Sequence, residues 1–378
     1  LVRSRGLGDV YKRQGQERIL KAILLERPDK IPCAPLILLH QARVAGISMS
    51  DYIWHPEKAA GACIRTCETY PGVDIFPGIQ SLLYVLPTIN AHSLWFFRWN
   101  IPETVEGGMP QLIEDEIISP EEYDLLMNEG FFYLTREDAP RISAVLRCLL
   151  AARKAFLRLD AYQEKRELFP YAQSLITTPL EVLSSLRGMK GYLTDVIDRP
   201  EKIRAFCEWL TGPIIRLCFA TLARRGISSS ASVLITISRS SASFMKEKHF
   251  AELSWPSLRQ IITAVLNKGH IPIIHLDTDW TSRIKYFKEL PPRRMLFHID
   301  DANDLRTWVE EMGDHSAIMG NVRSAVLAHG SMEDTIKHCR EIIQIGREAK
   351  GFILGSACEV PWDARPENIQ AMIQSTME

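Results

Sequence analysis

The chain has 378 residues, enough for one large domain or two ordinary ones, and its 46% apolar and 24% charged residues are ordinary for a globular protein. Its formal net charge of −1 gives no bulk attraction for nucleic acid or an anionic membrane. We find no apolar run long enough to span a bilayer and no secretion signal. The eight cysteines are scattered without paired spacing, which indicates reduced thiols and a cytoplasmic protein.

Residues 1–14, "LVRSRGLGDVYKRQ", differ from the rest of the chain because they show neither helical nor strand periodicity. They resemble the translated adapter read-through found at the ends of metagenomic sequences, and a native flexible leader is the alternative. We therefore expect residues 15–378 to form a single folded domain.

That domain begins with an amphipathic helix, "QERILKAILLERPDKIP", which we expect to end at the turn pair Pro28-Asp29. Short apolar runs then alternate with longer helical patterns. The strand candidates are residues 31–39, 73–78, 169–177, 230–237, 270–276, 293–299, 316–322 and 351–357. The helical patterns between them include residues 56–70, 199–225, 246–268, 302–312 and 331–350, the last capped by Ser331.

Several strand candidates are apolar at consecutive positions, which is typical of parallel strands that are covered on both faces. Eight such strands alternating with helices predict an α/β fold of the (β/α)8 TIM barrel type, as a single domain. A doubly wound open sheet is the alternative, but no Gly-rich phosphate turn follows the first strand. Residues 92–126 predict a short insertion after the second strand, in the form of a hairpin or lid.

The active site of such a barrel lies at the carboxyl ends of its strands. The polar residues expected there are His40, Gln41, Asp74, Gln173, Ser174, Thr177, Thr236, Ser238, Arg239, His275, Asp277, His298, Asp300, Asn321, Cys358 and Glu359. Among these we expect a substrate pocket to be lined by His40, Asp74, Gln173, Ser174, Arg239 and Asn321.

A metal site is the sharpest hypothesis among these residues. His275 and Asp277 are two positions apart on one strand, so their side chains point the same way. With Cys358 from another strand they offer the nitrogen, oxygen and sulfur ligands that zinc accepts, and catalytic zinc keeps one position open. The alternatives are a structural histidine, a cysteine that is merely a small buried apolar residue, and Asp300 with Asp301 as an N-cap pair.

The segment "TISRSSASF" raises a second possibility, because its hydroxyls and Arg239 could bind an anionic group of a substrate. An ordinary polar loop with an exposed arginine is the alternative.

Six stretches of the chain are distinctive, namely "RPDKIP", "HPEKAAGACIRTCETYPGVDIF", "SLRGMKGYLTDVIDRPEKI", "HIPIIHLDTDW", "GDHSAIMGNV" and, above all, "GFILGSACEVPWDARPENIQAMI". In these stretches the chain resembles, from Gln16 to Glu378, the uroporphyrinogen decarboxylase superfamily, whose fold is a (β/α)8 barrel. One branch of this superfamily decarboxylates a tetrapyrrole without a cofactor. The other transfers methyl groups between a corrinoid on a partner protein and a thiol or folate, often with zinc.

The decarboxylase motifs are altered in this chain. Where those enzymes have Arg-Gln-Ala-Gly-Arg, this chain has "HQARV", with His40 and Val44 at the arginine positions, although Arg43 could compensate by a one-residue shift. Ser81 stands nearest to the place of the catalytic aspartate, and Cys358 takes the place of the histidine of a Gly-His-Gly motif. A substrate with eight carboxylates needs a strongly cationic pocket, so these losses disfavour decarboxylation.

The methyltransferase branch holds zinc on a His-x-Cys pair after the fifth strand and on a distal cysteine. His275 and Cys358 match that pattern, and Asp277 stands where the first cysteine would be. Zinc tolerates oxygen in place of sulfur but binds it less tightly. His40 or Glu359 could supply a further ligand or an orienting partner.

The resemblance therefore implies a methyltransferase in which His275, Asp277 and Cys358 are metal ligands and catalytic residues. It implies Zn2+ as cofactor, a small-molecule methyl acceptor, and a corrinoid carried by a partner protein, because no Asp-x-His-x-x-Gly motif is present in this chain. A homodimer is possible in this superfamily. The alternatives are a decarboxylase of porphyrinogen carboxylates and a barrel that binds a corrinoid or methyl donor without catalysis.

Overall fold

The computed structural model describes residues 15–78, 98–100, 111–131 and 139–377. The predicted leader, residues 1–14, and much of the predicted insertion lie outside this range. The strands are β1 (Cys33–Leu36), β2 (Ile75–Phe76), β3 (Arg98–Asn100), β4 (Gln111–Ile113), β5 (Phe169–Pro170), β6 (Ser174–Thr177), β7 (Ser232–Ile237), β8 (Ile271–Leu276), β9 (Leu296–Ile299), β10 (Ala317–Val322) and β11 (Phe352–Glu359).

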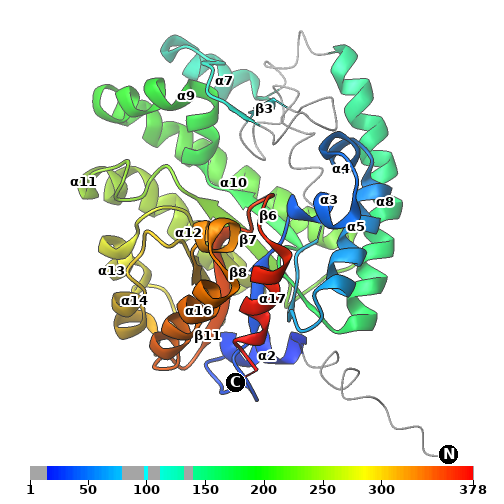
Figure 1. The fold of residues 1–378 in the computed structure, drawn as a ribbon. Helices are drawn as coiled ribbons and strands as arrows, with labels where there is room; N and C mark the ends of the chain where they lie inside the picture. Colours follow the sequence, from blue (N-terminus) through cyan, green and yellow to red (C-terminus); the bar gives the residue numbers. More distant parts are fainter. Residues whose placement is uncertain (1–14, 79–97, 101–110, 132–138, 378) are drawn as a thin grey trace, which may run out of the picture.

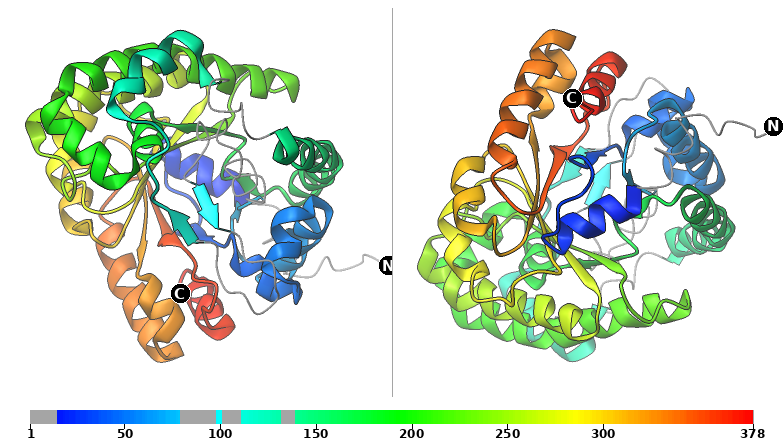
Figure 2. Two further views of the ribbon diagram at one scale, coloured as in Figure 1. Left: turned by 90° about the horizontal axis from the view of Figure 1, so that it is seen from above. Right: turned by 90° about the horizontal axis from the view of Figure 1, so that it is seen from below.

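The helices surround these strands as an outer ring when the molecule is viewed from above or below (Figure 2). The α-helices are α2 (Gly15–Ile23), α3 (His40–Ala45), α4 (Met49–Trp54), α5 (Pro56–Thr69), α7 (Tyr123–Glu129), α8 (Ala139–Arg166), α9 (Pro179–Asp198), α10 (Pro200–Arg224), α11 (Glu247–His249), α12 (Trp255–Asn267), α13 (Ile284–Phe287), α14 (Leu305–Met312), α15 (Ser324–His329), α16 (Met332–Gly346) and α17 (Pro366–Gln374). Short 3-10 turns lie at Pro120–Glu122 and Thr281–Arg283, and a π-helical turn lies at Phe250–Ser254.

The main sheet is parallel, with seven strands in the order β1-β11-β10-β9-β8-β7-β6. Strands β2 and β5 form a separate parallel pair. A backbone hydrogen bond from the Asp74 amide to the Cys33 carbonyl (2.8 Å) links this pair to β1, one edge of the sheet. At the other edge, the chain runs from β5 into β6 through residues 171–173. The described residues therefore confirm an α/β fold with a curved parallel sheet, in which regular pairing covers seven strands.

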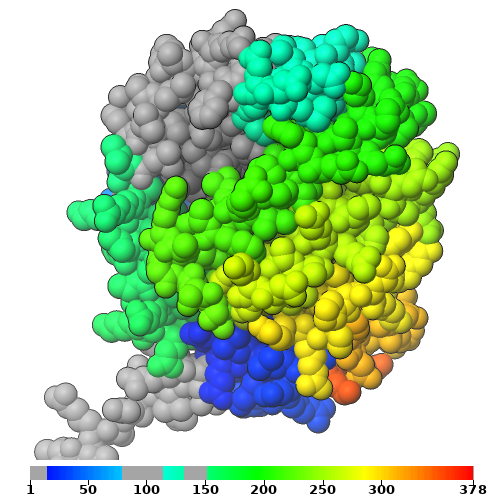
Figure 3. Space-filling view, turned by 180° about the vertical axis from the view of Figure 1, so that it is seen from behind, coloured from blue at the N-terminus to red at the C-terminus, as the bar shows by residue number. Residues whose placement is uncertain are grey.

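Alternation along each strand divides the apolar side chains between two cores. In β8, Ile274 and Leu276 belong to the larger core between sheet and helices, whereas Ile271 and Ile273 belong to a smaller inner core. The inner core also contains Ile19 and Ile23, so α2 contributes to it from one end. Figure 1 shows α2 below the sheet, at the end opposite to α7 and α9. From behind, α8, α10 and α12 cover the sheet (Figure 3).

The eight predicted strand regions all contain strands, but the third is divided. Residues 169–177 form β5 and β6 with a break between them, so Ser174 begins a strand. Two helix ends also differ from prediction. The first helix ends at Ile23, before Leu25 adopts a positive φ of 59°, and α14 begins at Leu305 with Asp304, not Asp300 or Asp301, as its N-cap. Ser331 caps α16 as predicted.

The predicted insertion contains an antiparallel pair, β3 with β4, as expected for a hairpin. Residues 92–97 and 101–110 of the insertion lie outside the described range. Figure 1 shows β3 and α7 above the sheet.

Helix α10 is long and apolar enough to cross a membrane by length and composition, contrary to our expectation from the sequence that no segment would be. It packs against β6, α9 and α12, and it buries Ile203, Phe206 and Leu210 in the larger core. This packing is that of a core helix.

A buried arginine connects α2 to the first two strands. The Arg18 guanidinium donates two hydrogen bonds to Asp29 (2.7 and 2.8 Å) and one to Asp74 (3.0 Å). The second oxygen of Asp74 accepts from the Cys33 amide at 2.9 Å. Burial raises the pKa of Asp74, while Lys30, the Cys33 amide and Arg18 oppose that rise.

We predict that Arg18→Met lowers the free energy of unfolding by about 3–5 kcal/mol, because it leaves the Asp74 carboxylate buried without its cation. Adding Asp74→Asn to that variant restores part of the loss. Lys21→Met on the same helix, whose partner Glu17 is exposed, leaves stability unchanged. Urea unfolding measures all three. Equal stability of Arg18→Met and wild type would contradict this interpretation.

Candidate metal centre

Two histidines lie side by side on neighbouring strands. His275 of β8 and His298 of β9 are paired in register, and their ring centroids are 4.5 Å apart. Each continues the alternation of the inner core, after Ile273 in β8 and Leu296 in β9. The inner face of the sheet therefore changes from apolar to polar at the carboxyl ends of these strands.

Cys358 reaches His275 from β11, beyond an irregularity in that strand. The pairing of β11 with β1 shifts between Ala34, opposite Gly355, and Leu36, opposite Glu359, so β11 carries extra residues there. The Ser356 hydroxyl stabilises this bulge, since it accepts from the Leu36 amide at 2.9 Å and donates to the Cys358 carbonyl at 2.5 Å.

The donor atoms of His275, Asp277 and Cys358 all lie within 4.8 Å of one another. His275 Nε2 is 3.1 Å from Asp277 Oδ1 and 3.5 Å from Cys358 Sγ. Ligand atoms on a tetrahedral zinc ion, at about 2.0–2.3 Å from the metal, are separated by roughly 3.3–3.8 Å. The residues present therefore fit a zinc ion in both chemistry and spacing. The Asp277 side chain is 37% exposed, which leaves the cluster open on that side.

The electrostatics of the cluster are those of a paired acid and base. Burial lowers the pKa of His275, but the Asp277 carboxylate outweighs it and the net shift is upward. Burial opposes the shift of Asp277, and the His275 ring beside it lowers that pKa to about 2. Burial and Asp277 raise the pKa of the Cys358 thiol well above its ordinary value. A cation placed among these three groups would favour the deprotonated thiol.

The other nitrogen of His275 faces a small buried network. Its Nδ1 lies 2.8 Å from Nδ1 of His298 and 3.3 Å from the Tyr171 hydroxyl. That hydroxyl is 2.7 Å from Nδ1 of His298, whose Nε2 lies 2.7 Å from the Ser356 carbonyl. Burial and the adjacent His275 lower the pKa of His298 to about 3.

Further carboxylates lie around the cluster. Glu359 follows Cys358 and accepts from the Leu39 amide, and burial raises its pKa to about 7. Asp300 follows β9, and burial raises its pKa as well. Electrostatic interaction with His275 opposes the rise in both. The mouth of the sheet near His275 is therefore acidic.

Asn303 fixes the loop that carries Asp277. Its side-chain oxygen accepts from the Trp280 amide (2.7 Å) and from the Trp308 indole (3.2 Å). Its amide group donates to the Thr278 carbonyl at 2.7 Å. These bonds connect the loop after β8 to the loop after β9, and so position both ends of the predicted site.

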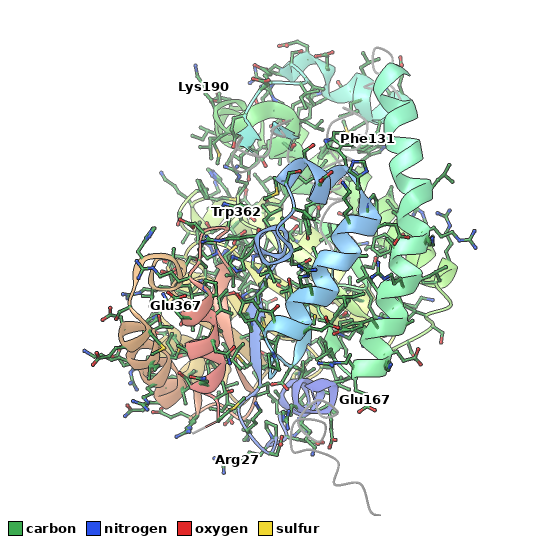
Figure 4. All side chains as sticks on the ribbon, turned by 45° about the vertical axis from the view of Figure 1, so that its right-hand side comes forward. Arg27, Phe131, Glu167, Lys190, Trp362 and Glu367 are labelled. Atoms are coloured by element: carbon green, nitrogen blue, oxygen red, sulfur yellow. The ribbon has the colours of Figure 1, made fainter. Side chains whose placement is uncertain are left out.

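The predicted pocket residues divide between the two ends of the sheet. Asn321 lies at the carboxyl end of β10, where its amide group donates to the Asn303 carbonyl at 3.3 Å. His40 also lies beyond a strand end, but it is fully buried in α3. Its ring nitrogens contact the Trp362 carbonyl (2.9 Å) and the Tyr70 hydroxyl (3.3 Å). Figure 4 shows Arg27 at the lower end of the molecule and Trp362 well above it, near the middle.

Three predicted pocket residues lie at the amino end instead, so the expectation that their strands deliver them to the carboxyl end is wrong. Asp74 precedes β2 and bonds to Arg18. Gln173 precedes β6, where its side chain accepts from the Ser232 amide at 3.1 Å, and Ser174 is the first residue of that strand.

Arg239 lies beyond the carboxyl end of β7 but is held by other side chains. Its guanidinium contacts Glu114 at 2.7 Å and Met189 at 3.4 Å. The buried carboxylate of Glu181 accepts from the amides of Ser238 and Arg239, both at 2.7 Å. The segment "TISRSSASF" therefore continues β7 into a loop that hydrogen bonds to Glu181 and to Glu114 of the insertion hold in place.

Three residues that surround the ligand cluster were not predicted as site residues. His298 was visible as a polar strand end. Tyr171 gave no signal, because an aromatic residue in an apolar run is typical of any strand core. Asn303 was hidden in a polar loop, where asparagine is common for reasons of turn geometry.

The structure thus defines an α/β protein with a potential metal-ligand set at the carboxyl edge of a parallel sheet. A model of the family described as Uroporphyrinogen decarboxylase (URO-D) matches residues 163–378, more than half of the chain. The chain belongs to this family.

A methyltransferase from Methanosarcina mazei has a similar structure, with a TM-score of 0.70 over 96% of this chain and 98% of that one. At 14% sequence identity, this likeness shows a common fold. No curated protein sequence matches the chain significantly.

Proposed function

We propose that this protein is a zinc-assisted methyltransferase that moves a methyl group between a protein-bound corrinoid and a thiol or folate. The observation that carries the proposal is the clustering of His275, Asp277 and Cys358 donor atoms within 4.8 Å at the carboxyl edge of the sheet. We also propose that β2 and β5 complete a (β/α)8 barrel, since β2 is bonded to the β1 edge of the sheet and β5 leads directly into β6 at the other edge.

The chain's own residues would hold the ion and leave an approach to it. His275, Asp277 and Cys358 would hold the ion, with the exposed side of Asp277 as the approach for the acceptor. A zinc ion held there would supply Lewis acidity that lowers the pKa of a thiol acceptor from about 8.5. Methyl transfer to such a thiol would form a carbon–sulfur bond with the sulfur electron pair, leave the pair of the broken cobalt–carbon bond on the corrinoid, and release the thiol proton to solvent.

The acidic surroundings of His275 favour this reaction over decarboxylation of a porphyrinogen. Asp277, Asp300 and Glu359 supply carboxylates where a substrate with many carboxylates would need cations. Arg43, the possible substitute for the missing arginines, is exposed on α3. A dication, in contrast, is stabilised by the same carboxylates.

The fold comparison supports the proposal at a coarser level, because a methyltransferase shares this fold over nearly its whole length. We propose that the corrinoid arrives on a separate protein, since no cobalamin-binding motif was found in the sequence.

We predict about one zinc ion per chain in the purified protein, and its loss in His275→Ala and in Cys358→Ser. Methyl transfer from methylcobalamin to a thiol, or to a folate, falls by at least about 100-fold in both variants. Plasma emission spectrometry and a cobalamin absorbance assay measure the two quantities.

The matched control is Cys67→Ser, which removes a partly exposed thiol from α5 and retains both zinc and activity. Wild-type protein that binds no zinc would contradict the metal centre. Release of carbon dioxide from a porphyrinogen, without methyl transfer, would replace this function by decarboxylation.

We further predict that Asp277→Cys binds zinc more tightly than wild type, because a second thiolate replaces a harder oxygen ligand. Competition with a chromophoric chelator measures the affinity. Asp277→Asn, which keeps the size but removes the charge, weakens binding. An unchanged affinity in both variants would exclude Asp277 from the ligand set.

A further inference from the structure

Behind the ligand cluster, Nδ1 of His275 faces Nδ1 of His298. His298 Nε2 lies 2.7 Å from the Ser356 carbonyl oxygen, which can only accept a hydrogen bond. The proton of a neutral His298 ring therefore lies on Nε2, and its Nδ1 carries a lone pair. His298 is fully buried, and the Tyr171 ring lies edge-on to it at 5.8 Å, so the ring has little room to turn.

This arrangement determines the proton on the neighbouring ring. Nδ1 of His275 is 2.8 Å from Nδ1 of His298, a distance that requires a proton between the two nitrogens. Because His298 presents a lone pair there, His275 must donate from its own Nδ1. The Tyr171 hydroxyl, 2.7 Å from Nδ1 of His298, donates to the same lone pair, and its oxygen, 3.3 Å from Nδ1 of His275, can accept the His275 proton. Donation from the Tyr171 hydroxyl to His275 would leave two lone pairs facing each other, which is unfavourable.

We propose that His298 is a positioning residue that keeps the Nδ1 proton of His275 in place and so presents the Nε2 lone pair to a metal. Nε2 is the nitrogen that faces Asp277 and Cys358, at 3.1 and 3.5 Å. This role rests on the proposed function, because it serves zinc binding, but the hydrogen bonds between the two rings do not depend on a metal. His298 is not itself a fourth ligand, because the Ser356 carbonyl and the neighbouring ring occupy both of its nitrogens.

The alternative to a positioning role is that His298 merely fills the inner core. Three variants separate the two roles. His298→Leu fills the space but accepts no hydrogen bond. His298→Asn keeps an acceptor near the position of Nδ1, since its side-chain oxygen branches from the same carbon. Tyr171→Phe removes the hydroxyl that contacts both rings but leaves the bond between His275 and His298, and it is the matched control.

The first measurement is zinc affinity, by chelator competition, with thermal unfolding of each metal-free variant as a check on folding. We expect a loss of about 10–100-fold in His298→Leu, recovery of most of that loss in His298→Asn, and near-wild-type affinity in Tyr171→Phe. Equal affinity in wild type and a folded His298→Leu would overturn the positioning role. So would equal losses in the Leu and Asn variants.

The second measurement needs no metal. Nitrogen-15 NMR of the histidine rings at alkaline pH distinguishes the two neutral tautomers. We expect His275 to carry its proton on Nδ1 in the wild type and on Nε2, facing Asp277, in His298→Leu. The same tautomer in both would overturn the proposal even if zinc binds. If the wild type binds no zinc while the tautomer switches as expected, the proposed function fails and the effect of His298 on His275 stands.

Discussion

The register of β8 against β9 is the constraint on which the site depends. It places His275 directly beside His298, at the level where the inner face of the sheet changes from apolar to polar. A shift of one residue in either strand would turn one of the two rings into the larger core, between the sheet and the helices. Because Ile273 and Leu296 precede these rings on the same face, apolar packing on the inner side of the sheet fixes the position of a polar centre.

The second constraint is the bulge in β11, which brings a cysteine from a non-adjacent strand to the same point. Ser356 makes two contributions here, because its hydroxyl stabilises the bulge and its carbonyl accepts a hydrogen bond from His298. Ser356 thus links the position of Cys358 to that of His298, which contacts His275. The backbones of β8, β9 and β11 position His275 and Cys358, and the loop after β8 carries Asp277.

Much of the fold and of the candidate metal centre could be predicted from the sequence. Period-two alternation predicted that His275 and Asp277 would converge, and consecutive apolar residues predicted a parallel sheet. Cys358, which no local pattern ties to β8, was joined to these two residues as a residue at another strand end of the expected barrel, and the resemblance to the family supported that choice. Asp74, Gln173 and Ser174 were misplaced because a run of apolar residues does not show where a strand begins. Residues 169–177 contain a break that only the pairing of β5 with β2 explains. Tyr171 was not found, because its contacts are with two rings over a hundred residues away.

The most direct test of the account is X-ray absorption spectroscopy of the zinc-loaded protein, because it counts the ligand atoms. The account predicts one sulfur at about 2.3 Å and a remaining shell of nitrogen and oxygen at about 2.0–2.1 Å. The sulfur signal should vanish in any zinc that Cys358→Ser retains. A first shell of nitrogen and oxygen alone in the wild type would show that Cys358 is not a ligand, and would contradict the central claim that β8 and β11 build one metal centre.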